Sequence, residues 1–181
     1  AEGLVRNLPG FARFLDLVGF SHGELLNYAN IARDCAIDAK TVKEYYQILE
    51  DTLIGYLVRP FVKKIRRDLI RATPKFYLFD VGIANFMARK SIKTLAGVDA
   101  GRSLEHFIFT EIKAFLGTKE LDYTVNYWRS RTGLEVDFVI NEGEVAIEVK
   151  ISRSPALRDL AGLKAFCEDY HPKHALVVCQ A

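Results

Sequence analysis

The sequence has no cysteine framework and no long apolar run. Its three cysteines are widely spaced and form no C-x-x-C pair: Cys35, Cys167 and Cys179. Neither a disulfide scaffold nor a zinc knuckle is indicated, and reduced thiols in a cytoplasmic compartment are the simpler interpretation. The early apolar stretch 8–20 is interrupted by Arg13 and Asp16, whereas a membrane span needs roughly 20 apolar residues. We therefore expect a cytoplasmic protein that has no membrane partner.

The sequence also has a low net charge and a single methionine. With 25 basic and 23 acidic side chains in 181 residues the net charge is +2, so a nucleic-acid partner requires a local basic patch. The 50% hydrophobic and 27% charged composition excludes a disordered or collagen-like chain and fits one large domain or two small ones. Met87 is the only methionine, so we expect the chain to be processed or cut from a longer protein.

Two zones of different pattern predict two domains. The stretch between them is poor in aromatic residues and contains Gly97 and Gly101. We place a linker at 89–101, between a domain at 1–88 and a domain at 102–181. Helical periodicity dominates the first domain, and a mixture of strands and helices follows in the second.

In the first domain, apolar residues recur at helical spacing in three stretches: 9–18, 25–35 and 42–53. Asp38 stands where an N-cap belongs before the last of them, and Ala36 and Ile37 complete a tight turn. Two short helices about such a turn indicate a helix-turn-helix. Tyr56–Val58 and Phe76–Phe79 are rich in β-forming residues and are expected to form the hairpin wing of a winged helix.

A basic stretch accompanies these strands. Between residues 59 and 75 only Asp68 opposes seven basic residues: Arg59, Lys63, Lys64, Arg66, Arg67, Arg71 and Lys75. Such clustering favours binding to DNA phosphates, because neutralised phosphates release condensed counterions. A solvated surface face is the alternative interpretation.

The expected recognition helix is less basic. Lys40 and Lys43 are further candidates for DNA contacts, but Asp38 and Glu44 balance their charge. The pattern therefore predicts non-specific binding rather than reading of bases in the major groove. A helix-turn-helix can also serve as a protein-interaction module, because a fold does not determine function.

The second domain is predicted to run helix, three strands, helix, strand. We expect a helix at 103–116, strands at 123–129, 134–140 and 145–151, a helix containing Leu160, Leu163 and Phe166, and a buried strand at 174–178. Glu105 and Glu111 fall within or beside the apolar stripe of the first helix. A buried acid needs a basic partner, backbone donors or a metal, so both are candidate site residues.

The hairpin of the second and third strands brings charges together. If residues 142–143 form a two-residue turn, Asp137 lies opposite Glu148 and Glu135 opposite Lys150, and a four-residue loop keeps that register. Alternation places these four side chains on one face and the aliphatic side chains on the other. Opposed carboxylates destabilise a sheet. Lys150 could compensate them in a surface ion-pair cluster, or a divalent cation could do so in a hard-oxygen site suited to magnesium.

The remaining polar and aromatic candidates have structural explanations. The four histidines fit no ligand spacing with carboxylates and are expected on the surface: His22, His106, His171 and His174. Tyr127 and Trp128 are expected to pack in the core or cover the sheet rather than stack on bases, since aromatic strand residues usually pack.

The motif of Asp137 followed by Glu148-Val-Lys150, with the helical acid Glu105 upstream, resembles the PD-(D/E)XK nuclease superfamily of restriction-endonuclease-like folds. The core of that superfamily runs α-β-β-β-α-β. The resemblance implies that Asp137 and Glu148 bind Mg²⁺ or Mn²⁺, that Glu105 completes the ligand shell directly or through water, and that Lys150 is the catalytic lysine. Glu111 is the second choice for the helix acid. The implied reaction is metal-assisted phosphodiester hydrolysis.

The whole chain is similar to a domain of unknown function found C-terminal to prokaryotic AAA+ ATPases, in which a winged helix precedes a nuclease-like domain. The similarity rests on four segments: 27–33, 41–53, 74–80 and 127–131. The sequence departs from the full architecture because it contains no G-x-x-x-x-G-K-[ST] motif, so we expect the ATPase portion upstream of Ala1.

Together these features predict an α+β protein, with an N-terminal winged helix-turn-helix and an α-β-β-β-α-β PD-(D/E)XK nuclease-like domain. One candidate function is a magnesium-dependent DNA nuclease module of an AAA+ ATPase. Another is a catalytically inactive regulatory module that binds DNA or protein and is coupled to the ATPase. A winged-helix transcription regulator is a third. DNA, the upstream ATPase domain and further copies of the chain are the partners that these functions imply.

Overall fold

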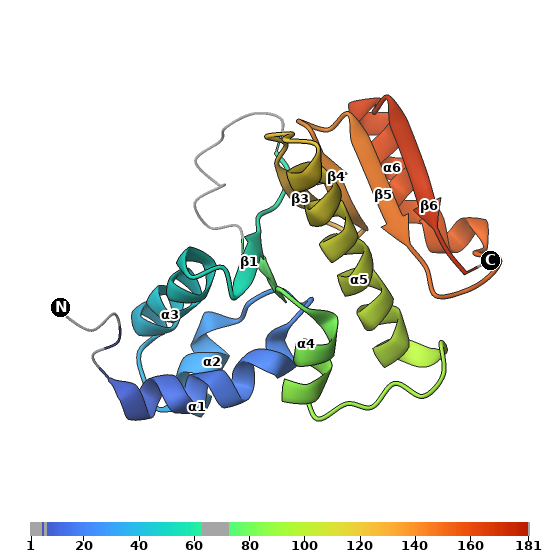
Figure 1. Ribbon diagram of the computed structural model, residues 1–181. Helices are drawn as coiled ribbons and strands as arrows, with labels where there is room; N and C mark the ends of the chain where they lie inside the picture. The colour runs from blue at the N-terminus through green and yellow to red at the C-terminus, as the bar shows by residue number, and fades with distance from the viewer. Residues whose placement is uncertain (1–4, 6, 63–72, 181) are drawn as a thin grey trace. The chain divides into compact units, whose positions relative to one another are not determined.

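The computed structural model describes residues 5, 7–62 and 73–180, and Figure 1 shows its mixture of helices and strands. This mixture confirms the predicted α+β class. The chain divides into two compact units, the first comprising Ala1–Leu57 and Thr73–Ser91 and the second Val58–Ala72 and Ile92–Ala181. The second unit therefore includes residues 58–62, which the sequence pattern assigns to the first domain.

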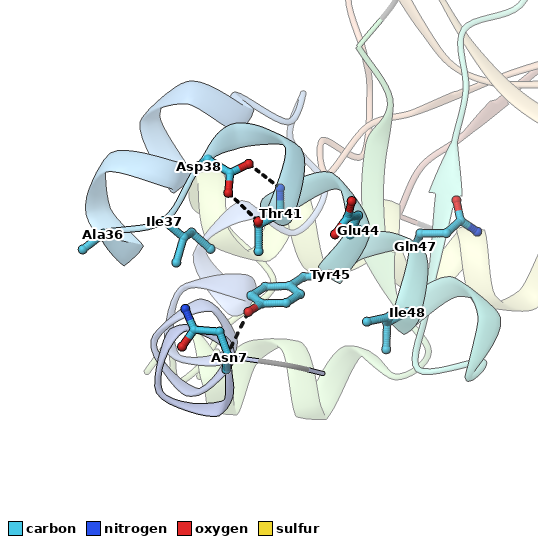
Figure 2. A pocket seen from close by; sticks show the side chains of 9 residues that line it. All are labelled: Asn7, Ala36, Ile37, Asp38, Thr41, Glu44, Tyr45, Gln47 and Ile48. Atoms are coloured by element: carbon cyan, nitrogen blue, oxygen red, sulfur yellow. Dashed lines mark hydrogen bonds between the residues drawn. The ribbon is translucent and has the colours of Figure 1, made fainter. Parts of the chain in front are cut away.

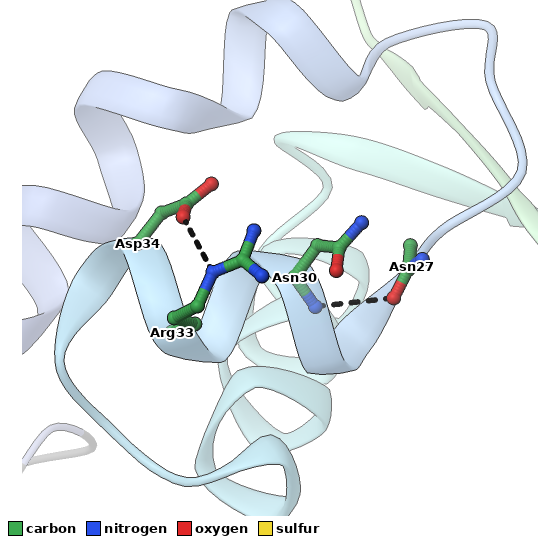
Figure 3. A network of polar contacts seen from close by, with 4 residues as sticks. All are labelled: Asn27, Asn30, Arg33 and Asp34. Atoms are coloured by element: carbon green, nitrogen blue, oxygen red, sulfur yellow. Dashed lines mark hydrogen bonds and ion pairs between the residues drawn. The ribbon is translucent and has the colours of Figure 1, made fainter.

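Each α-helix of the first unit begins at a side chain that caps its first turn. The elements are α1 (Leu8–Val18), η1 (Gly19–Ser21), α2 (Tyr28–Cys35), α3 (Ala39–Asp51), β1 (Gly55–Val58), β2 (Lys75–Leu78) and α4 (Val81–Met87), with β1 paired to β2. Asn27 accepts a hydrogen bond from the Asn30 amide at 3.1 Å at the start of α2, as Figure 3 shows. One turn further along that helix, the Arg33 and Asp34 side chains form a surface ion pair at 3.4 Å.

The turn between α2 and α3 agrees with the sequence-based prediction. Ala36 adopts a left-handed φ of 52°, and the Asp38 carboxylate accepts a hydrogen bond from the Thr41 amide at 2.9 Å. Behind the turn, Tyr46 of α3 is 1% exposed and makes edge-on contacts with Phe14 and Phe76, at centroid distances of 4.8 and 4.9 Å. This aromatic core joins α1, α3 and β2.

The second unit is built around a four-stranded sheet in the order β3-β4-β5-β6. Its elements are α5 (Gly97–Thr118), β3 (Val125–Arg129), β4 (Glu135–Ile140), β5 (Val145–Val149), η3 (Leu157–Leu160), α6 (Ala161–Tyr170) and β6 (His174–Val178). The chain order of helix, three strands, helix and strand matches the prediction. Neighbouring strands are antiparallel, except that β6 runs parallel to β5.

An aromatic cluster holds α6 against this sheet. Phe166 of α6 lies 5.5 Å from Trp128 of β3 and 5.7 Å from Phe61, between ring centroids. Trp128 and Tyr127 are 5% and 4% exposed, which confirms that they pack in the core. Phe61 reaches the cluster because its amide donates a hydrogen bond to the Tyr127 carbonyl at 2.6 Å.

Helix α5 differs in its bounds and its buried side from the prediction. It begins at Gly97, inside the expected linker, and packs on the sheet through Phe109, whose ring lies 5.9 Å from Phe138. The helical spacing predicts an apolar stripe of Leu104, Ile108, Ile112 and Phe115, but Phe115 is 57% exposed. Even this long helix carries too much polar character for a membrane span, and no other described helix qualifies either.

Two other expectations about burial are wrong. Strand β6 is exposed along most of its length, with Leu176 at 47%, because it forms one edge of the sheet. Conversely, His22 and His106 are 5% and 0% exposed rather than on the surface, whereas His171 and His174 are exposed as expected. The covering of a strand or helix depends on distant elements, which local periodicity does not reveal.

Candidate functional site

Strands β4 and β5 form the predicted hairpin. The paired positions follow the predicted register: Phe138 with Ile147, Val139 with Ala146 and Ile140 with Val145. The connection is the four-residue loop 141–144, in which Asn141, Glu142 and Gly143 all have positive φ. Gly143 also lies against Phe61, where a Cβ atom would come within 2.7 Å of the ring. Glycine is therefore favoured there both by φ and by space.

A bulge in β4 changes the direction of Asp137. The pairing of β3 with β4 shifts by one residue between Asn126 and Trp128, so that Tyr127 lies against two residues of β4, Asp137 and Phe138. Such a bulge bends the strand and redirects side chains, and bulges are frequent beside active sites. The Asp137 carboxylate reaches across to β5, where its Oδ2 accepts a hydrogen bond from the Val149 amide at 2.7 Å.

The bulge also makes the predicted strict alternation of β4 wrong. Val136 and Val139 both pack in the cluster beneath α6, whereas Phe138 contacts Phe109 of α5. Val136 and Phe138, which strict alternation would place on the same face, therefore point to opposite faces of the sheet. The aliphatic and charged side chains of the hairpin are not separated onto two faces as the sequence suggested.

Glu148 is a buried carboxylate with one oxygen engaged by a lysine. The residue is 4% exposed, and its Oε1 lies 2.5 Å from Lys150 Nζ. Within the described part of the chain, its buried Oε2 has no hydrogen-bond partner. Burial raises the pKa of Glu148; Lys150 opposes this shift, and the charges of Glu105 and Glu135 add to it. Burial alone would lower the pKa of Lys150, but its hydrogen bond to Glu148 and the neighbouring carboxylates raise it, so Lys150 is a cation at neutral pH.

The two helix acids lie in different surroundings. Glu105 is partly buried, and its charge acts on both Glu148 and Lys150. Glu111 is exposed to solvent further along α5. Among the described residues, no three His, Cys, Asp or Glu side chains are placed to hold one metal ion together. The structure brings Asp137, Glu148 and Lys150 together, and the charge of Glu105 acts on two of them.

The donors of this site suit a hard divalent cation. The buried Glu148 Oε2 is an acceptor that a cation would satisfy, and carboxylate oxygens are the preferred ligands of Mg²⁺ and Mn²⁺. Mg²⁺ usually keeps several water ligands and needs only one or two protein carboxylates. Asp137 and Glu148 are the residues that would hold it.

Two charged residues at the same end of the sheet were not among the predicted site residues. Arg129 of β3 and Glu135 of β4 are directly paired, with Arg129 Nη1 3.6 Å from Glu135 Oε2. The charge of Glu135 contributes to the raised pKa of Glu148. The turn at 131–133 was the available signal, because antiparallel pairing about that turn places residue 129 opposite residue 135.

The predicted basic surface is only partly described. Five of its residues lie outside the described residues: Lys63, Lys64, Arg66, Arg67 and Arg71. Arg59 is exposed, but Lys75 is 5% exposed. Lys75 is therefore wrongly assigned to a DNA-binding surface, because β2 is buried along its whole length.

The lysines of α3 are exposed but interact with their neighbours. Lys40 Nζ lies 3.8 Å from the Glu44 carboxylate, and Lys43 Nζ lies 5.2 Å from the centre of the Tyr28 ring. Both lysines could still contact a phosphate, because surface pairs of this kind contribute only about 0–1 kcal/mol.

A pocket of about 640 Å³ runs along α3 in the first unit, as Figure 2 shows. Its lining consists of Asn7, Ala36, Ile37, Asp38, Thr41, Glu44, Tyr45, Gln47 and Ile48. The Tyr45 hydroxyl donates a hydrogen bond to the Asn7 carbonyl at 3.0 Å, and Asp38 and Glu44 are the charged lining residues. An acidic lining does not favour a phosphate backbone.

In a comparison with known proteins, each half of the chain matches a family model. Residues 1–97 match a family model described as a domain of unknown function (DUF8612), and residues 100–181 match another domain of unknown function (DUF4143). No solved structure matches the chain. The boundary between the two models coincides with the first turns of α5.

Two mycobacterial proteins are among the relatives. The uncharacterized proteins Rv2008c of Mycobacterium tuberculosis and Mb2031c of Mycobacterium bovis are each 25% identical over 148 residues. The match covers 75% of this chain and 31% of either relative, so the chain spans about a third of their length. Because the first family model covers more than half of the 181 residues, the chain belongs to the DUF8612 family and continues into a DUF4143 region.

Proposed function

We propose that the chain is the DNA-binding, nuclease-like module of an AAA+ ATPase and hydrolyses DNA phosphodiesters with Mg²⁺ or Mn²⁺. The observation that carries this proposal is the buried Glu148 carboxylate, whose Oε2 lacks a hydrogen-bond donor among the described residues while Asp137 and Lys150 lie beside it. A buried acceptor left unsatisfied costs free energy, and cation binding would remove that cost.

The roles of the residues follow from their positions. A bound Mg²⁺ would polarise the scissile phosphate and acidify a water molecule. Asp137 is held toward β5 by the Val149 amide, which orients its carboxylate for the ion. Lys150, a cation at neutral pH, would stabilise the negative charge that develops on the phosphate. Glu105, whose charge acts on Glu148 and Lys150, would complete the ligand shell through water.

The association with an ATPase and with DNA rests on less direct support. The sequence resembles modules that follow AAA+ ATPase domains, and the relatives are about three times longer than the matched region. We propose a winged helix-turn-helix for α2, α3, β1 and β2, with non-specific DNA contacts from the basic stretch. A cytoplasmic location follows from this role.

A second candidate function is a catalytically inactive regulatory module that binds protein through the first unit. The acidic lining of the α3 pocket favours it, because negative charge opposes close approach of a phosphate backbone. In this case the carboxylates of the second unit would bind no metal.

Calorimetric titration of the full chain with MgCl₂ or MnCl₂ tests the proposal. We expect binding by the wild-type chain, loss of binding in Asp137→Asn, and metal-dependent cleavage of DNA by the wild type alone. Asp122→Asn, which neutralises an exposed aspartate before β3, is the matched control and should bind metal normally. Unchanged metal affinity in Asp137→Asn would reject the site, and metal binding without cleavage of duplex, single-stranded or branched DNA would favour the regulatory function.

A further inference from the structure

The ion pair between Arg129 and Glu135 lies beside the proposed site on the sheet of the second unit. The two residues are opposite each other at the adjoining ends of β3 and β4. Glu135 lies two residues before Asp137 in the same strand, β4. The ion pair therefore lies at the same end of the sheet as the proposed site.

The pair has little value for stability alone. The Arg129 side chain is 45% exposed and that of Glu135 is 27% exposed, and exposed pairs contribute about 0–1 kcal/mol. Their separation of 3.6 Å exceeds a hydrogen bond, so Glu135 draws the guanidinium toward itself by charge without using its N–H donors. A guanidinium that is open to solvent can bind a phosphate through two parallel hydrogen bonds.

We propose that Arg129 binds a backbone phosphate next to the one that is hydrolysed, and that Glu135 is a positioning residue that holds the guanidinium toward the strand. The inference rests on the proposed function for its ligand, DNA. It adds a phosphate contact from β3 to a site otherwise formed by β4, β5 and α5. The contact assists binding of the strand and takes no part in bond breaking.

Salt-dependent binding of a fluorescent duplex, measured by anisotropy with Ca²⁺ in place of Mg²⁺, separates this role from hydrolysis. Arg129→Gln should weaken binding about tenfold at the lowest salt concentration and reduce the log–log salt slope by about 0.9, the value for one lost phosphate contact. Arg129→Lys should keep the wild-type slope but recover only part of the affinity, because an ammonium lacks the planar fork.

Two further variants distinguish phosphate binding from a structural role. Glu135→Gln removes the same ion pair but keeps the guanidinium, so its salt slope should stay at the wild-type value. Arg158→Gln removes an arginine of η3 that also pairs with a carboxylate, Asp159 at 3.8 Å, and should bind like the wild type. A slope unchanged in Arg129→Gln, or reduced equally in Glu135→Gln, would overturn the inference.

The same data separate this inference from the proposed hydrolysis. A wild-type chain that binds DNA with the expected Arg129 dependence but never cleaves it supports the phosphate contact and contradicts the nuclease function. Cleavage by the wild-type chain, combined with a salt slope that does not change in Arg129→Gln, supports the nuclease function and contradicts the phosphate contact. A chain that binds no DNA overturns both.

Discussion

At the end of the β4–β5 hairpin, a charged side chain is buried at a cost in stability. Glu148 is 4% exposed, and Lys150 engages only one of its oxygens. Burying a carboxylate is unfavourable unless both oxygens are compensated. The alternation of the strands suggested that Lys150 stood on an open polar face, but its side chain is 31% exposed and lies 2.5 Å from the buried Glu148 carboxylate. Removing Lys150 should lower stability, because it leaves that carboxylate without its basic partner.

Glu148→Gln should keep or raise the melting temperature of the metal-free chain at neutral pH and abolish stabilisation by Mg²⁺. Burial raises the pKa of Glu148 above its ordinary value of 4.5, so the folded state binds the proton more tightly than the unfolded state. Wild-type stability therefore rises as the pH falls through the folded-state pKa toward 4.5, and the advantage of the variant shrinks over that window. Thermal unfolding in EDTA at several pH values measures both effects.

The control for this prediction is Glu168→Gln, which neutralises an exposed acid of α6. Its melting temperature should follow the wild type at every pH. A large loss of stability in Glu148→Gln at neutral pH would mean that the ion pair with Lys150 outweighs the cost of burial.

At the scale of elements, the seating of α6 on β4 links the core to the site. Gly162 of α6 lies against the backbone of Glu135, where a Cβ atom would come within 1.8 Å of the carbonyl oxygen. No side-chain rotation can relieve a contact with backbone, so the helix or the strand must move. Glu135 is the partner of Arg129, and a shift there would also disturb the proposed phosphate contact.

Gly162→Ala should destabilise the chain by about 1–3 kcal/mol, even though alanine favours a helix, because overpacking against backbone outweighs helix propensity. Gly117→Ala is the matched control, since nothing lies within 4 Å of a Cβ atom at this position of α5. It should gain about 0.5–1 kcal/mol from the same propensity. Urea denaturation measures both, and equal stabilisation by the two substitutions would contradict the close seating of α6.

At the scale of the whole molecule, the chain joins its two units in an interleaved way. Residues 58–62 belong with the second unit, although 73–91 return to the first. Phe61 holds residues 58–62 against the rest of the second unit. It is 8% exposed and contacts Phe166 and Tyr170 at centroid distances of 5.7 and 5.3 Å. A fragment beginning at the linker would therefore lack part of the core of the second unit.

Phe61→Ala should lower the stability of the second unit by about 3–5 kcal/mol, because it removes a buried ring and leaves a cavity beside α6. Trp128 is the only tryptophan and lies in the same cluster, so its fluorescence reports unfolding of that unit. Phe86→Ala is the control, since Phe86 is 83% exposed. A fluorescence midpoint that does not move in Phe61→Ala would show that the crossing segment is dispensable.

Sequence-based prediction succeeded where interactions are local. The Asp38 cap, the turn at Ala36 and the register of the β4–β5 hairpin depend on residues near one another in the chain, and all three are confirmed. It failed for Lys75 and β6, because their exposure depends on which distant elements cover them. The assignments of Asp137 and Glu148 to a metal and of Lys150 to catalysis stay predictions.

By itself the sequence determined the α+β class, the order of the elements and the register of the β4–β5 hairpin over its paired positions, because capping and strand pairing are decided by local spacing. Only the tertiary structure decided that a bulge turns Asp137 toward the Val149 amide and that Glu148 is buried with one oxygen lacking a hydrogen-bond partner among the described residues. The reason is physical: burial, pKa and the direction of a side chain depend on the elements packed around it, and these come from distant parts of the chain.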